Sequence, residues 1–140
     1  DELQNFKERN TEVIACSVDS QYTHLAWLQT PRESGGIRGT SYPILSDLSK
    51  KISEDFGVLD KEKGVALRGL FLIDKNNIIQ HSIINNLSIG RNVDEVLRTI
   101  DALQFIEESG EVCPANWKPG ETSMEATQNG IKNYFGYGSR

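Results

Sequence analysis

The sequence predicts an α/β fold, and three observations support this prediction. Short apolar runs typical of buried strands alternate with segments in which apolar residues recur every three to four positions. A length of 140 residues fits one domain. The hydrophobic fraction of 37% and the charged fraction of 25% suit a globular protein with its own core.

Composition also excludes several classes of function. The net charge of -5 gives no basic surface for nucleic acid. No apolar run approaches the roughly 18 residues that cross a bilayer. The two cysteines are far apart and the sequence has only two histidines, so neither a disulfide framework nor a zinc site is indicated. We therefore expect no metal, cofactor, nucleic-acid or membrane partner, and reduced thiols in an intracellular compartment.

The first part of the chain predicts, in order, a helix, a strand, a second helix and a loop. Residues 1–10 show helical spacing, and residues 12–18 form an apolar, partly β-branched run that predicts a buried strand. Asp19 and Ser20 can cap a helix that holds Leu25, Trp27 and Leu28. Several prolines and glycines predict a loop over residues 30–43.

The second half begins with a helix that Ser46 or Asp47 can cap and that Gly57 ends. Residues 65–74 predict a central strand, residues 75–77 a turn, and residues 78–84 a second strand, so the pair forms an antiparallel hairpin. Residues 92–107 carry the clearest helical stripe. The remaining polar segment shows weak helical character near residues 129–135.

This order of elements is that of a thioredoxin-like fold. Such a fold also needs an earlier strand, which pairs at the sheet centre and leads into the helix at residues 1–10. We expect that piece to be missing from the 140 residues. The predicted organisation is an N-terminally truncated thioredoxin-like domain over residues 1–107 and a C-terminal tail over residues 108–140.

Four segments resemble motifs of the typical 2-Cys peroxiredoxins, also called thioredoxin peroxidases. The segment at 110–120 resembles the resolving-cysteine segment, that at 17–27 the strand–helix junction, that at 67–74 the active-site arginine strand, and that at 85–98 the entry to the last helix. The four motifs occur in the family's order and span essentially the whole chain. The residues Ile-Asn-Asn-Leu and Trp-Lys-Pro-Gly within them are similar to those of plastid and cyanobacterial members.

The resemblance implies reduction of hydrogen peroxide and alkyl hydroperoxides by thiol chemistry. In such enzymes a peroxidatic cysteine becomes a sulfenic acid, a resolving cysteine of the partner subunit condenses with it, and thioredoxin or a similar dithiol reduces the disulfide. The resemblance also implies a homodimer, with a decamer as a further level of assembly, in the cytoplasm or the plastid stroma. The family's motif around the peroxidatic cysteine does not occur in this sequence, so we expect the chain to be inactive alone.

Two residues are the candidate catalytic groups, and each has a simpler structural interpretation. The resemblance assigns Cys113 as the resolving thiol; otherwise it is an incidental cysteine of a partly exposed, mobile tail. Arg68 interrupts an apolar strand, and the resemblance places it beside the peroxidatic thiol, where it lowers that thiol's pKa and binds peroxide oxygens. Its structural interpretation is an arginine at a strand edge, paired with an acidic neighbour. Cys16 sits within a predicted strand, and we expect it to be a buried apolar side chain.

Other residues are expected to support the site. We expect His24 and Trp27 to be packed structure, and the resemblance implies that they lie close to the peroxidatic pocket. For Arg91 the resemblance implies an ion-pair network near that pocket; otherwise it is a solvated residue before the last helix. In oxidation-sensitive members a Gly-Gly-Leu-Gly-type loop and a Tyr-Phe pair hold the tail down. Tyr134 and Phe135 match the pair, whereas the loop at 35–39 carries Arg where the family has Gly.

A binding role is the alternative function. The chain could be a redox-signalling or holdase chaperone partner without peroxidase chemistry of its own. A reductase of the thioredoxin type is not indicated, because the sequence contains no Cys-x-x-Cys motif.

Overall fold

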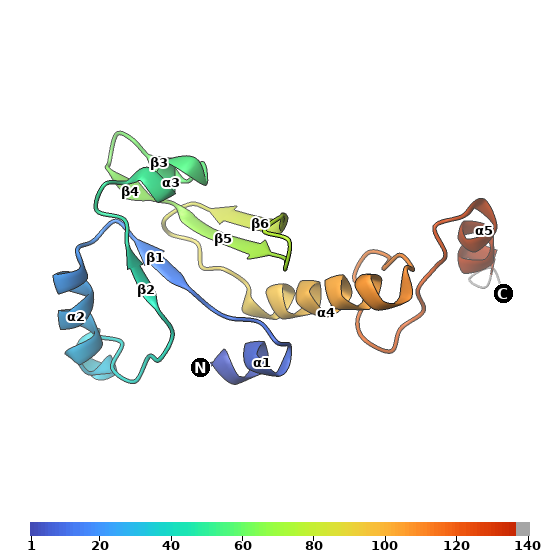
Figure 1. The fold of residues 1–140 in the computed structure, drawn as a ribbon, viewed down its shortest axis with the longest axis horizontal. Coiled ribbons are helices and arrows are strands. Elements are labelled where there is room, and N and C mark those ends of the chain that lie inside the picture. The colour runs from blue at the N-terminus through green and yellow to red at the C-terminus, as the bar shows by residue number, and fades with distance from the viewer. Residues whose placement is uncertain (137–140) are drawn as a thin grey trace. The chain divides into compact units, whose positions relative to one another are not determined.

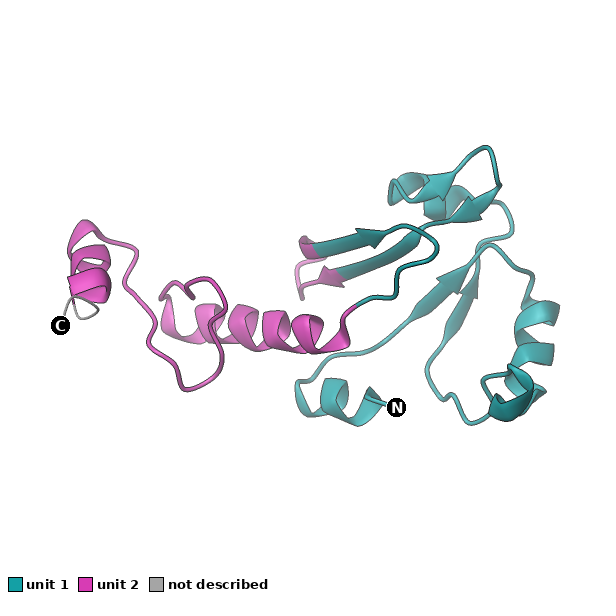
Figure 2. Ribbon diagram, turned by 180° about the vertical axis from the view of Figure 1, so that it is seen from behind, with its two compact units in different colours: residues 1–71, 82–91 teal, residues 72–81, 92–140 magenta. Residues whose placement is uncertain are grey.

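The computed structural model describes residues 1–136 and divides the chain into two compact units. The first unit contains residues 1–71 and 82–91, and the second contains residues 72–81 and the chain from residue 92 (Figure 2). The elements, in chain order (Figure 1), are α1 (Leu3–Glu8), β1 (Ala15–Ser17), α2 (Gln21–Gln29), the 3-10 turn η1 (Arg32–Ser34), β2 (Ile44–Ser46), α3 (Lys51–Asp55), β3 (Leu59–Asp60), β4 (Val65–Ala66), β5 (Arg68–Ile73), β6 (Ile79–Asn85), α4 (Val93–Ser109) and α5 (Gln128–Gly136).

The first unit is built on a parallel pair of strands. β1 pairs with β2 so that Ala15 lies opposite Ile44 and Ser17 opposite Ser46. The predicted strand at 12–18 contains β1. The sequence analysis placed no strand at β2, because three residues directly after a proline give no periodicity. Parallel strands need a crossover connection, and α2 lies within it.

The predicted caps of the two helices in this unit differ in outcome. Ser20 caps α2 as predicted, because its hydroxyl accepts a hydrogen bond from the amide of Thr23. α3 begins at Lys51 rather than directly after Asp47. The buried Asp47 carboxylate still serves the helix start, since it accepts hydrogen bonds from the amides of Ile52 (3.0 Å) and Ser53 (2.7 Å). Gly57, at φ +68°, follows the helix as predicted.

The predicted single strand at 65–74 is divided into β4 and β5. Leu67 separates them: its amide donates to Val58, and its carbonyl accepts from the amide of Gly69 at 2.8 Å, which closes a tight turn. β4 consequently pairs with β3, a strand too short to predict, while β5 pairs with β6 in the expected hairpin. The hairpin turn holds Asn77 at φ +63°, a conformation that asparagine tolerates.

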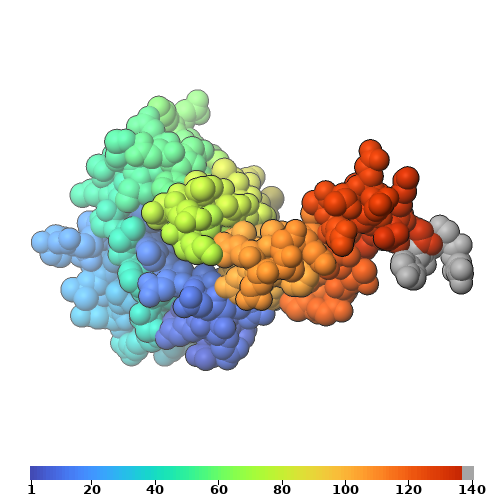
Figure 3. Space-filling view, turned by 45° about the vertical axis from the view of Figure 1, so that its right-hand side comes forward, coloured from blue at the N-terminus to red at the C-terminus, as the bar shows by residue number. Residues whose placement is uncertain are grey.

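The second unit is organised around α4. Asn92 caps its start by accepting from the amide of Glu95, and Gly110, at φ +72°, ends it. The predicted apolar stripe supplies the core, in which Val96, Leu97 and Ile100 are buried. The chain then forms a loop that packs directly on α4, as the adjoining orange shades of the space-filling view show (Figure 3).

None of the helices in residues 1–136 is long and apolar enough to cross a membrane.

Candidate functional site

The candidate resolving thiol, Cys113, lies four residues beyond Ser109, where α4 ends, and packs back against that helix. Its side chain is half-buried, and its sulfur lies 3.9 Å from the carbonyl oxygen of Ala102. Val112, just before it, pairs with Met124 in a short antiparallel bridge of two backbone hydrogen bonds. The partial exposure agrees with the sequence analysis. The segment is nevertheless folded onto the helix through specific contacts.

Trp117 is the main apolar anchor of this loop. Only 3% of its surface is exposed, and its ring packs on Phe105 of α4 with centroids 4.8 Å apart. Its indole N–H donates to the carbonyl of Glu121 at 3.0 Å. A turn from Pro114 to Trp117 leads into the anchor, with Asn116 at φ +63°. The loop thereby keeps Cys113 beside α4.

Burial of Cys113 keeps it in the less reactive thiol form while the loop is closed. Burial raises the pKa of the Cys113 thiol, and the nearby positive charge of Arg98 opposes that rise without cancelling it. A thiol with a raised pKa is protonated at neutral pH, and the thiolate is the nucleophilic form. Cys113 therefore gains reactivity when its surroundings open to water.

The second candidate, Arg68, is the first residue of β5 and is exposed. The expectation of an arginine within the apolar run is corrected here, since the turn at Leu67 places the guanidinium at the strand's start. Its Nε donates to the carbonyl of Leu87 at 3.2 Å. In return, Arg91 donates to the carbonyl of Gly69 at 3.1 Å.

Arg68 and Arg91 thus fasten the start of β5 to the loop that follows β6. Within residues 1–136 neither guanidinium forms an ion pair with a carboxylate. The acidic partner of the structural interpretation of Arg68, and the ion-pair network expected for Arg91, are therefore not found there. Two guanidinium groups without carboxylates can supply hydrogen bonds to an anion or to peroxide oxygens.

Cys16 is exposed, so its predicted burial was wrong. Side chains alternate along β1, and Cys16 points to the opposite face from Ala15 and Ser17. No described element covers that face enough to bury the residue. Partial desolvation, and then the negative charge of Asp47, raise the pKa of the Cys16 thiol. It therefore lacks the electropositive surroundings of a nucleophilic cysteine.

Of the two α2 residues, His24 matches its expected packed role, whereas Trp27 is 44% exposed and does not. His24 is 4% exposed, and its Nε2 lies 2.6 Å from the Ser17 hydroxyl. The indole of Trp27 donates to the carbonyl of Gly35 at 3.0 Å, which holds the glycine loop against the helix. In that loop Gly35 and Gly39 take positive φ angles and Arg38 does not, so the arginine is accommodated without strain.

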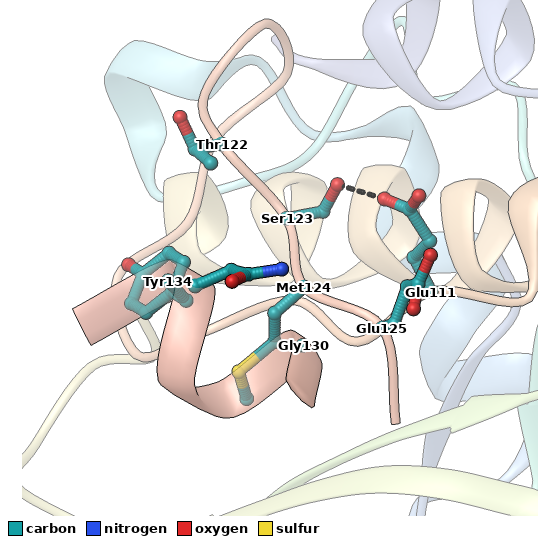
Figure 4. Close-up of a pocket in the computed structure, with 8 residues that line it drawn as sticks. Glu111, Thr122, Ser123, Met124, Glu125, Gly130 and Tyr134 are labelled. Atoms are coloured by element: carbon teal, nitrogen blue, oxygen red, sulfur yellow. Dashed lines mark hydrogen bonds between the residues drawn. The ribbon is translucent and has the colours of Figure 1, made fainter. Parts of the chain in front are cut away.

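A pocket of about 560 Å³ lies between the end of the Cys113 loop and α5 (Figure 4). Glu111, Glu125 and Tyr134 are among its lining residues, and the Ser123 hydroxyl donates to Glu111. Neither cysteine lines it, so it is not the thiol site. Tyr134 packs edge-on against Phe135, at 5.3 Å between ring centroids. The docking of this pair on the rest of the protein stays a prediction.

The structure places Arg68 in the first unit and Cys113 in the second. It does not bring these two candidates together within one unit. Sequence reasoning missed Arg98 and Trp117, which the structure places in the same unit as Cys113. The spacing of Glu95 and Arg98, three residues apart on one helix face, was the available signal for an ion pair.

Comparison with known proteins places these features in a family. Residues 1–82 match the AhpC/TSA family, and residues 102–136 match the C-terminal domain of 1-Cys peroxiredoxin. The chloroplastic 2-Cys peroxiredoxin BAS1 of Hordeum vulgare is 56% identical over 96% of this chain and 64% of its own length. A thioredoxin peroxidase of Trypanosoma brucei rhodesiense is 50% identical over 96% of this chain and 68% of its own.

The structure is similar to the crystal structure of reduced Plasmodium vivax 2-Cys peroxiredoxin. The TM-score is 0.93 and the identity 51%, over 96% of this chain and 69% of that one. The predicted α/β, thioredoxin-like fold of the peroxiredoxin type is confirmed. The chain belongs to the AhpC/TSA family, and within it to the 2-Cys peroxiredoxins. It spans between about half and two thirds of the length of the curated relatives it matches.

Proposed function

We propose that this chain is part of a thiol peroxidase that reduces hydrogen peroxide and alkyl hydroperoxides, in which Cys113 is the resolving thiol. The observation that carries the proposal is the environment of Cys113, on a folded loop in a chain of this family. Its thiol is half-buried, and its pKa is raised rather than lowered. Such a thiol is suited to react with an already activated sulfur, and not to attack a peroxide itself.

The proposed reaction needs a second cysteine that these 140 residues do not supply. That cysteine's thiolate attacks the peroxide ROOH, the O–O bond breaks, and the sulfur keeps one oxygen as sulfenic acid while ROH leaves. Cys113 then attacks this sulfur, an S–S bond forms, and the oxygen leaves as water. A dithiol reduces the disulfide by thiol–disulfide exchange and is itself oxidised.

Arg68 is proposed to act on the first of these steps. Its guanidinium is exposed, has no carboxylate partner among the described residues, and is held at the start of β5 by Leu87. A positive charge beside a thiol favours the thiolate, and its N–H groups can bind a peroxide oxygen.

The proposed reductant is thioredoxin or a similar dithiol, since a relative is named a thioredoxin peroxidase. We also propose assembly into homodimers, and from these into decamers. Exposed isoleucines on the hairpin support a subunit contact, with Ile79 49% and Ile84 47% exposed. The chloroplastic relatives favour a plastid location over the cytoplasm.

A disulfide map of the protein purified from its source cells tests this function. After one equivalent of hydrogen peroxide, non-reducing peptide mass spectrometry should find Cys113 linked to a cysteine outside these 140 residues. A Cys113→Ser variant should accumulate the first cysteine's sulfenic or sulfinic acid instead. A disulfide between Cys16 and Cys113, or a Cys113 that stays reduced, would refute the resolving role.

The alternative is a holdase chaperone, and the exposed apolar side chains are the observation that favours it. Leu25, Leu45 and Leu48 are among many large apolar residues with more than two fifths of their surface exposed. If the protein is a holdase, it should suppress thermal aggregation of a client protein even when its own Cys16 and Cys113 are both replaced by serine. The peroxidase proposal expects peroxide consumption by the whole protein to be lost in Cys113→Ser.

A further inference from the structure

Arg98 of α4 lies where the helix meets the loop that carries Cys113. It forms a two-pronged ion pair with Glu95, in which Nε and Nη2 each donate to a carboxylate oxygen at 2.7 Å. The Arg98 side chain is 25% exposed and the Glu95 side chain 40%. A planar guanidinium held by two parallel hydrogen bonds has a fixed direction, unlike a flexible surface cation.

The third nitrogen of Arg98 connects the helix to the loop. Its Nη1 donates to the backbone carbonyl of Trp117 at 3.1 Å. Trp117 is the buried anchor, and its ring packs on Phe105 of the same helix. A hydrogen bond from a charged donor to a carbonyl is stronger than one between neutral groups, so Arg98 adds a directed polar attachment to the apolar one.

The charges keep this attachment in place at neutral pH. The hydrogen-bonded Arg98 lowers the pKa of Glu95, and Glu95 raises the pKa of Arg98. Both groups are therefore ionised when Cys113, whose pKa burial raises, is still a thiol. His81 of β6 also bears on the pair, because its charge, when protonated, lowers the pKa of Glu95 further.

We propose that Arg98, oriented by Glu95, is a positioning residue for Cys113: it fastens the Cys113 loop to α4 through the Trp117 carbonyl and limits how often the thiol is released. The clamp is defined as Glu95, Arg98 and the Trp117 carbonyl. Its consequence for disulfide formation rests on the proposed function, whereas its effect on the exposure of Cys113 does not. A looser clamp exposes the thiol more often, and a thiol in water has a more ordinary pKa.

Alkylation by iodoacetamide tests the clamp in the whole protein without peroxide. Site-resolved mass spectrometry gives the rates at Cys113 and Cys16 in the same molecule, from pH 7 to 10.5. The high-pH limiting rate reports accessibility of the thiolate, and the midpoint reports its pKa. Cys16 lies in the other unit and serves as an internal control for general loosening.

Arg98→Ala should raise the limiting rate at Cys113 about tenfold, equivalent to about 1.4 kcal/mol of loop-opening free energy. Arg98→Lys should raise it nearly as much, because an ammonium cannot hold both Glu95 oxygens and the Trp117 carbonyl in one plane. Glu95→Gln should give a smaller rise in the same direction. Cys16 should change by less than twofold in all three.

Lys75→Met is the matched control. It removes an exposed ion pair of 2.8 Å to Glu107 on the same helix, which involves neither Arg98 nor Glu95, and should leave Cys113 within twofold of the parent rate. If Arg98→Ala does not fold, Arg98→Lys and Glu95→Gln carry the test.

Three outcomes would overturn the clamp. One is an unchanged limiting rate at Cys113 in both Arg98 variants. Another is full restoration by Arg98→Lys, which would mean that charge alone acts. The last is a parallel rise at Cys16, which would mean general unfolding. A clamp that passes this test while Cys113 never forms a disulfide would refute the proposed function alone.

Discussion

Trp117 offers the strongest quantitative test of how the Cys113 loop is held. The residue is 3% exposed, its ring packs on Phe105 with centroids 4.8 Å apart, and its indole donates to the Glu121 carbonyl at 3.0 Å. Truncating a buried tryptophan to alanine costs about 3–5 kcal/mol. Of this, the aromatic pair accounts for about 0.5–1.5 kcal/mol and the hydrogen bond for about 1 kcal/mol. We expect Trp117→Ala to lower the free energy of unfolding by about 4 kcal/mol.

Trp27 supplies a matched comparison within the same chain. Its indole also donates to a backbone carbonyl at 3.0 Å, but 44% of the residue is exposed. Trp27→Ala should therefore cost about 1–2 kcal/mol, the hydrogen bond plus a half-buried ring. The two substitutions delete the same atoms and differ in burial and in the aromatic partner.

Urea unfolding followed by far-UV circular dichroism measures both costs, and the alkylation rate of Cys113 reports the loop itself. Trp117→Ala should destabilise the chain at least twice as much as Trp27→Ala and should accelerate alkylation of Cys113. Equal costs for the two variants, with Cys113 no more reactive in either, would show that the loop is not held on α4 by this anchor.

Four further outcomes can be checked on the same chain. The 140 residues should consume no peroxide above the rate of a free thiol; family-level turnover that Cys16→Ser abolishes would contradict this. Gly36→Ala should destabilise the chain by about 2 kcal/mol, because the added Cβ would lie 2.0 Å from the Thr30 carbonyl oxygen. Gly90→Ala should cost little, because a Cβ at that position has no atom within 4 Å. Equal melting temperatures of the two variants would refute the reasoning. Desolvation would raise the pKa of Asp47, but hydrogen bonds from Ser53 and the neighbouring amides lower it overall. The contribution of Asp47 to the free energy of unfolding is therefore present above the ordinary Asp pKa and is lost as the pH falls through the lowered pKa. Asp47→Asn should flatten the acid limb of a stability–pH curve, and an unchanged limb would argue against this. Burial raises the pKa of Cys113. Its contribution to the free energy of unfolding is therefore present below the ordinary thiol pKa of about 8.5 and is lost as the pH rises through the folded-state pKa. Cys113→Ala should reduce the alkaline loss of stability in melts from pH 8 to 10.

The sequence predicted best the elements whose signals are local. α4 has a repeating apolar stripe, an Asn92 cap and a Gly110 end, and each acts within a few residues of itself. The short strands β2 and β3 have two or three residues each, too few for a periodicity. The division of the strand at 65–74 depends on Val58, whose carbonyl accepts from Leu67 next to the β3–β4 pair, and no local pattern encodes that contact.

Burial was the harder property to predict, because it depends on what covers a side chain. The apolar run around Cys16 suggested a buried strand, yet β1 leaves this residue exposed. Arg68 looked like a charge within a buried strand and lies instead at its exposed start. The contact of Arg98 with Trp117 joins residues 19 positions apart, so only the folded chain reveals it.

The environment of Cys113 links the reactivity of the thiol to the opening of its loop. Burial on α4 raises its pKa and shields it, so the closed loop disfavours both the thiolate and its access to a partner. Opening removes both restraints together. If Cys113 is the proposed resolving thiol, it would be inert until the loop opens, and the contacts of Trp117 and Arg98 would set the time before it reaches the sulfenic acid. Under the proposed function, those contacts would set the balance between disulfide formation and further oxidation of the attacking cysteine.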